Sequence, residues 1–177
     1  MERDMTDDKD AATIAAQAPL RELVKKWSQF AEMHFERTGA MRPMWYAESA
    51  DGEGFVIDQP NISKDMAAAM VRALFRASNA VRCVFMDEAW TVKLSEADMA
   101  KFDAHRDAGG DVESYPGRQE IIAFMAEDVG LGNVLAHRLT IRPKGGKAHL
   151  GPLEFSKPNG RESGRFVGML PRPKLAS

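Results

Sequence analysis

The sequence predicts a single α+β domain, built as a mostly antiparallel sheet with helices packed on one face. Three observations favour this class. A chain of 177 residues fits one domain of ordinary size. Its first half holds two segments with helical periodicity, and its second half holds strand-like segments joined by connections too short for parallel crossovers. We find no repeat and no linker that would divide it.

Residues 1–18 are acidic and rich in alanine, with few large apolar side chains. They predict a flexible tail or a marginal helix outside the core, so the folded domain is expected to span 19–177. Pro19 suits the first turn of a helix, apolar residues recur at helical spacing from Leu20 onward, and Gly39 supplies a left-handed cap. A helix over 20–38 is therefore predicted.

The next segments indicate a hairpin and a second helix. "MWYAES" and "GFVID" flank the Asp51-Gly52 pair, a common signal for a tight reversal between antiparallel strands. Ser63 is a good N-cap for a helix that ends near Asn79. Met66, Met70, Ala73 and Leu74 lie on one stripe of that helix.

The second half begins with a strand and a short helix. The run 81–86 has no polar alternation after Arg82, which is typical of a central strand covered on both faces. Residues 95–107 predict a short polar helix that ends at Gly109-Gly110.

Three further strands are expected, at 119–127, 133–142 and 149–155. Their connections, "DVGLG" and "PKGGKA", are short, so consecutive strands should pair as an antiparallel meander. A last, weak strand is expected to include "RFVGML".

The composition, 44% apolar and 28% charged, is that of an average globular protein. The single cysteine, Cys83, excludes a disulfide framework and suggests a buried thiol in a reducing cytoplasm. No apolar stretch is long enough for a membrane span, and the acidic N-terminus lacks the pattern of a secretion signal. The expected localisation is therefore cytoplasmic, with no membrane association.

The formal net charge of −2 conceals an uneven distribution, because residues 137–177 hold nine Lys and Arg against two Glu. Such an imbalance indicates either an anionic partner or a basic segment lying on an acidic body. Candidate anion-binding residues, for nucleic acid among other partners, are Arg138, Arg142, Lys144 and Lys147.

Asp87 and Glu88 interrupt an apolar strand, and they should point to opposite faces of the sheet. The Pro116-Gly117 pair suits a type II turn that would place Arg118 near the end of that strand. One hypothesis is an ion pair of Glu88 with Arg118, covered by Trp90. The alternative is a divalent metal held by oxygen ligands from Asp87, Glu88 and Glu120, with Asp128 as a further candidate, as in hydrolases of phosphate esters.

Other catalytic and cofactor motifs are weak. "GLGN" at 130–133 joins two strands and lacks the following helix that would hold a phosphate. "PKGGK" at 143–147 reads as a hairpin turn, although its lysines could contact an anion. His137 shares a strand face with apolar neighbours and reads as a core histidine. The candidates for catalysis remain Asp87, Glu88, Arg118, Glu120 and His137, with no cofactor expected.

The segments "VFMDEAW", "YPGRQE" and "LAHRLTIRPKGGKAHLGPLEF" together resemble a group of small uncharacterised bacterial proteins with no known activity. That group carries an Asn/Asp-Glu-Ala-Trp strand, a Pro-x-Arg-x-Glu turn, and a segment in which Ala-His-Arg is followed by Arg-Pro and then by Leu-x-Pro-Leu. The resemblance covers roughly residues 44–170 and implies a shared fold. It assigns no catalytic role to the matching residues, which are Glu88, Trp90, Pro116, Arg118, Glu120, His137, Arg138 and Pro152.

The expected function is that of a small soluble binding protein, without assignable catalysis, that self-associates or contacts another protein. The amphipathic helix over 20–39 and the Met-rich helix over 64–78 offer the surfaces. Two alternatives stay open, a metal-dependent hydrolase at Asp87, Glu88 and Glu120, and nucleic-acid or anion binding through the basic C-terminal third.

Overall fold

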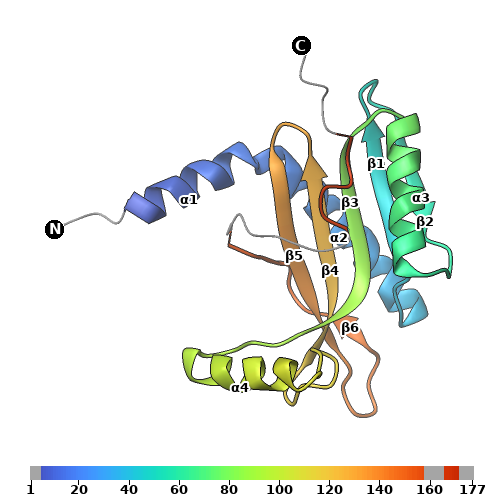
Figure 1. Cartoon of the computed structure of the whole chain (residues 1–177). Coiled ribbons are helices and arrows are strands. Elements are labelled where there is room, and N and C mark those ends of the chain that lie inside the picture. Colours follow the sequence, from blue (N-terminus) through green and yellow to red (C-terminus); the bar gives the residue numbers. More distant parts are fainter. Residues whose placement is uncertain (1–4, 158–165, 172–177) are drawn as a thin grey trace.

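A seven-stranded antiparallel sheet organises the chain in the computed structural model, which describes residues 5–157 and 166–171 (Figure 1). The helices are α1 (Met5–Ala16), α2 (Ala18–Thr38), α3 (Lys64–Ala77) and α4 (Glu96–Asp107). The strands are β1 (Met44–Ser49), β2 (Gly54–Asp58), β3 (Ala80–Thr91), β4 (Gln119–Asp128), β5 (Gly132–Ile141), β6 (His149–Leu150) and β7 (Glu154–Phe155).

The strand order is β2-β1-β3-β4-β5-β6, and β7 also pairs with β5. Every pair is antiparallel, so the predicted hairpin and the predicted meander are both present. The α+β class and the single antiparallel sheet are thereby confirmed.

The two long helices are divided between the faces of the sheet, although the sequence predicted helices on one face. Along β3, Val84 and Met86 join the apolar cluster beneath α2, while Cys83 and Phe85 join a second cluster beneath α3. The physical reason lies in β3 itself, because a strand that is apolar on both faces needs cover on both. The buried Cys83 confirms the expected packing role of its thiol.

Local signals set the ends of α2 and α3. Pro19 stands in the first turn of α2, and Gly39 ends the helix in the left-handed region with φ 73°. The Ser63 hydroxyl accepts a hydrogen bond from the Met66 amide at 3.3 Å, which caps α3 as predicted. The helix ends at Ala77, two residues before Asn79, whose φ is 51°.

The C-terminal segments differ from the expected strands. The predicted strand over 149–155 is interrupted into β6 and β7, both paired with β5, because Pro152 has no backbone N–H to donate. The described part of "RFVGML", from Phe166 on, forms turns instead of a strand. Met169 is buried there, and its amide donates to the Glu127 carboxylate at 2.9 Å.

Two helices extend from the body of the sheet, α1 at the N-terminal end and α4 between β3 and β4 (Figure 1). The residue that joins α1 to α2, Gln17, is buried, and its side-chain amide donates to the carbonyl of Asn133 at 2.9 Å. At the far end of α4, Tyr115 packs edge-on against Phe102 and His105. Among the described residues, no helix is long and apolar enough to span a membrane.

Candidate functional site

The outer face of α3 carries an apolar stripe that the sheet does not cover. α3 packs on the sheet through Ala67, Ala68, Val71 and Phe75. On the opposite side, an unbroken stripe at helical spacing consists of Met66, Ala69, Met70, Ala73, Leu74 and Ala77. Of these, Met66 is 62% exposed and Leu74 is 42% exposed. A helix that is apolar on two opposite sides is typical of one that is buried on both.

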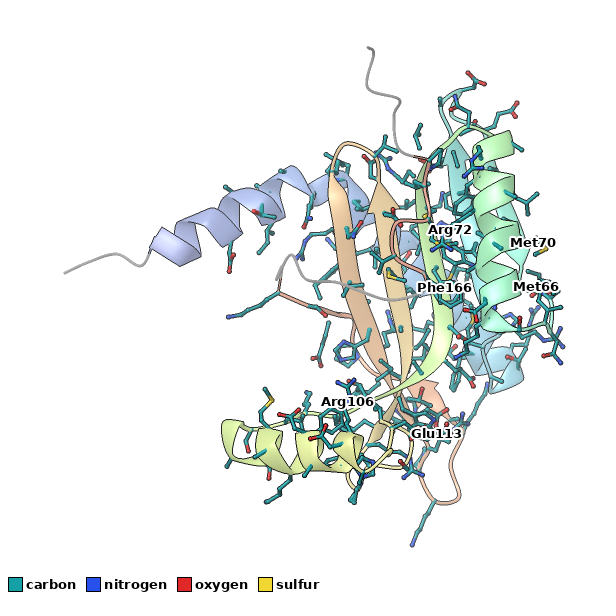
Figure 2. The ribbon with its side chains drawn as sticks, in the orientation of Figure 1. Met66, Met70, Arg72, Arg106, Glu113 and Phe166 are labelled. Carbon is teal, nitrogen blue, oxygen red and sulfur yellow. The ribbon has the colours of Figure 1, made fainter. Side chains whose placement is uncertain are left out.

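The stripe points toward the free edge of the sheet. Figure 2 shows Met66 and Met70 on the side of α3 that faces away from Arg72 and Phe166. Below the stripe, Phe55 and Ile57 of β2 are half-buried and border a shallow cavity of about 380 Å³ together with Leu74, Ala77 and Ser78. The stripe on α3, with Phe55 and Ile57, is named here the α3–β2 surface.

The backbone of β2 is paired with β1 on one side only, because β2 is the first strand of the sheet. The amide of Ser49 donates to the carbonyl of Glu53 at 2.9 Å, and the amide of Gln59 donates to the carbonyl of Pro43 at 3.0 Å. In an antiparallel pair, hydrogen-bonded positions recur at every second residue. Odd-numbered residues of β2 therefore turn their N–H and C=O groups toward β1.

The even-numbered residues of β2 turn their backbone groups outward. These residues are Gly54, Val56 and Asp58, and β2 has no strand partner on this side among the described residues. The strand has no lysine, no proline and no bulge against β1, which are devices that commonly protect an exposed edge, and its single charged residue, Asp58, stands at its end. Val56 is moreover 51% exposed. The edge is thus open to a further strand.

A larger cavity of about 660 Å³ lies where β2 ends. Its charged lining residues are Arg42, Asp58 and Lys64, and Pro60 and Ile62 contribute apolar walls. The end of β2 nearer α3's first turn is therefore flanked by two cations and one carboxylate. At the other end of β2, the hairpin turn carries Asp51 and Glu53.

The residues that the sequence singled out are distributed over both faces of the sheet. Asp87 lies on the face of Cys83 and Phe85, and Glu88 lies on the face of Val84 and Met86, as the strand alternation predicted. The Asp87 carboxyl is half-buried, and this burial raises its pKa from 3.8 to about 6, while a hydrogen bond from the Glu88 backbone and the charge of Lys64 partly lower it.

The predicted ion pair of Glu88 with Arg118 does not form. The Glu88 carboxylate instead accepts a hydrogen bond at 2.6 Å from the amide of Met41, in the segment that follows α2. The predicted turn is present, since Gly117 has φ 80° and the Arg118 amide donates to Tyr115. It places the Arg118 guanidinium over the ring of Trp90, 4.9 Å from its centre.

The structure does not gather the proposed metal ligands. Glu88 and Glu120 share the α2 face, but Asp87 lies on the other. Both Glu120 oxygens bind Arg142, and Asp128 binds Arg82 at 2.7 Å. Within residues 5–157 and 166–171, no three His, Cys, Asp or Glu side chains are grouped so that they could hold a metal ion.

Half of the predicted anion-binding set is already paired with carboxylates. Arg138 binds Glu32 at 2.7 Å, and Arg142 binds Glu120 through two hydrogen bonds of 2.6 and 2.9 Å. Lys144 and Lys147 are exposed in the turn between β5 and β6. They remain the cations of this set that point into solvent.

His137 belongs to a polar row that crosses the sheet. The strand register aligns Asp87, Ala123, His137 and Glu154 on neighbouring strands. His137 Nε2 lies 4.0 Å from a Glu154 oxygen, and Lys93 Nζ lies 4.0 Å from the same atom. Asp87 and His137 are two strand spacings apart, about 10 Å between backbones, so they form no direct pair.

The spacing of apolar residues in the sequence indicates the stripe on α3, but it does not indicate that β2 is an edge strand. The signal for the edge was present in "GFVID", an apolar strand without lysine or proline, yet only the strand order shows that it lies at the border of the sheet. Comparison with protein-family models, curated proteins and solved structures finds no match to this chain, so the site rests on its own geometry.

Proposed function

We propose that this chain is a binding protein whose α3–β2 surface contacts another protein chain. The observation that carries the proposal is the second apolar stripe of α3, which lies outside the core and faces the same side as the open edge of β2. An apolar helix face and an unpaired strand edge are two recurring elements of protein recognition. Here a single partner can cover both.

The other surface named from the sequence contributes less to this proposal. The apolar side of α2 packs against the sheet and is not available to a partner. Its fully buried residues include Leu20, Val24, Ala31 and Phe35. Its exposed side keeps a single large apolar group, Met33, which is 65% exposed. Isolated groups of this kind are ordinary on protein surfaces.

The two alternative functions receive less support from the geometry. A metal-dependent hydrolase needs oxygen ligands that converge, whereas Asp87 and Glu88 point to opposite faces. Anion binding needs free cations, whereas Arg138 and Arg142 are paired with Glu32 and Glu120. Neither of these two alternative functions would involve the apolar stripe of α3.

Photo-crosslinking in living cells tests the proposed surface. A photoreactive residue at Ala73, which is exposed in the middle of the stripe, should form crosslinks to a second protein chain. Met66→Lys and Leu74→Lys should abolish these crosslinks, because each places a charge in the apolar contact.

The matched control is Met33→Lys. Met33 has nearly the same exposed fraction as Met66, 65% against 62%, but it lies on α2. This variant should leave the crosslinks unchanged. The proposal is contradicted if Ala73 yields no crosslinks, or if the Met66 and Met33 variants reduce them equally.

A further inference from the structure

We propose that the chain covering the α3–β2 surface is a second copy of this protein, joined by antiparallel pairing of the two β2 strands. The inference rests on the proposed function and names its partner. In this dimer a two-fold axis passes beside Val56, and the two sheets form one continuous sheet.

The outward backbone groups of β2 are self-complementary in this arrangement. Gly54, Val56 and Asp58 all present N–H and C=O groups outward, because the odd-numbered residues of β2 are the ones that hydrogen-bond to β1. With Val56 at the axis, Val56 of each copy faces the other, and Gly54 faces Asp58. This register pairs the whole length of β2, whereas a shift in either direction leaves part of the strand unpaired.

The same arrangement brings the two apolar stripes together. Phe75 of α3 packs against Phe55 of β2 with ring centres 6.3 Å apart, so α3 reaches the edge of the sheet. In the dimer, the α3 helices of the two copies would lie over adjacent strand pairs of one continuous sheet. Helices in such positions are about 10 Å apart, which is the spacing of packed helices. Met66 and Met70 lie on the side of α3 that would face the second copy. Ala69 and Ala73 leave room for close approach.

The charges at the two ends of β2 fit an antiparallel copy. Asp51 and Glu53 lie in the turn before the strand. In the antiparallel dimer this acidic turn approaches the other copy's cavity at the end of β2, whose cations are Arg42 and Lys64. The Asp58 carboxylate in that cavity faces Gly54 across the pair, so no two acidic residues of the strands oppose each other.

A second copy is favoured over an unrelated partner because the occupant of this surface needs two structural features at the same time. The occupant must offer an unpaired strand edge and, beside it, an apolar helix face on the same side of that strand. This chain presents that combination itself, with α3 packed next to β2. A lone peptide strand would leave the Met66–Leu74 stripe in water.

The test uses the full-length protein and sedimentation equilibrium. The wild type should show the mass of two chains, with Val56→Lys and Val56→Glu each weakening the dimer about tenfold, because each puts like charges opposite at the axis. An equimolar mixture of the two variants should restore dimers that contain one of each. The matched control is Val129→Lys, at a residue that is also exposed but lies in the turn after β4, and it should dimerise as the wild type.

The possible results separate the dimer from the broader proposal. A wild type that stays monomeric at all concentrations overturns the dimer. If the crosslinks from Ala73 to another protein persist in that case, the proposed binding surface still stands. A dimer that is indifferent to both Val56 variants, or that the mixture does not restore, overturns the β2 pairing. Circular dichroism of each variant confirms that the fold is retained.

Discussion

Arg138 of β5 binds Glu32 of α2, with the guanidinium Nη1 2.7 Å from the carboxylate Oε1. The same side chain donates to the Ser28 hydroxyl at 2.7 Å and to the Gly151 carbonyl at 3.2 Å. Its side chain is only 12% exposed. One arginine therefore ties α2 to the sheet and to the segment after β6, which gives it a structural role.

Arg138→Ala should lower the free energy of unfolding by about 3 kcal/mol, because it leaves the buried Ser28 hydroxyl and the Glu32 carboxylate without their partner. Lys144→Ala, at an exposed turn, should change it by less than about 0.5 kcal/mol. Urea titration of both variants measures the difference. Equal stability of the two variants would show that the Arg138 contacts contribute nothing.

Asp87→Asn should stabilise the protein near neutral pH but not in acid. The folded-state pKa of Asp87, about 6, lies above its ordinary value of 3.8, so folding favours the protonated carboxyl. The protonated Asp87 carboxyl therefore contributes its full stabilisation below about pH 4, and this stabilisation is lost as the pH rises through 6. At pH 7.5 the variant should be more stable by on the order of 1 kcal/mol, because solvent screens a half-exposed carboxyl and reduces the effect of the pKa shift. A constant difference between pH 4 and 8 would contradict this reading.

Glu88→Ala should cost about 2 kcal/mol, because it removes the acceptor of the Met41 amide. Glu88→Gln should cost less, since its side chain keeps an oxygen acceptor. Arg118→Ala should cost under about 1 kcal/mol, because its guanidinium lies over Trp90, which is itself 38% exposed. Thermal melts of the three variants check this order. A greater loss of stability for Arg118→Ala than for Glu88→Ala would show that the contact of Arg118, and not that of Glu88, is the more important for the fold.

Removal of residues 1–15 should leave the melting temperature nearly unchanged, since α1 extends away from the sheet (Figure 1). Gln17→Ala should instead cost about 1 to 2 kcal/mol, because the buried amide binds the carbonyls of Leu131 and Asn133. Calorimetry of the truncated chain and of the Gln17→Ala variant measures both losses of stability. A collapse of the truncated chain would place α1 inside the cooperative unit.

Features that depend on neighbouring residues could be predicted from the sequence. The Asp51-Gly52 turn, the Ser63 cap and the Gly39 helix end each follow from the preferences of a few residues. The alternation that separates Asp87 from Glu88 follows from strand geometry in the same way.

Contacts between distant residues could not be predicted. Arg138 and Ser28 are 110 positions apart, and Gln17 and Asn133 are 116 apart. No local pattern shows that Arg138 is held by Glu32 instead of being available to an anion. The same holds for β2, because its place at the border of the sheet depends on how β1 pairs with β3.

Amide hydrogen exchange along β2 is the decisive measurement for the pairing of two β2 strands. Phe55 and Ile57 donate their amides to β1, so they should be protected at every protein concentration. Val56 and Asp58 point outward, so we predict that they are protected in the concentrated protein and lose that protection on dilution. Free exchange of the Val56 and Asp58 amides in the concentrated protein would show that the two β2 strands do not pair.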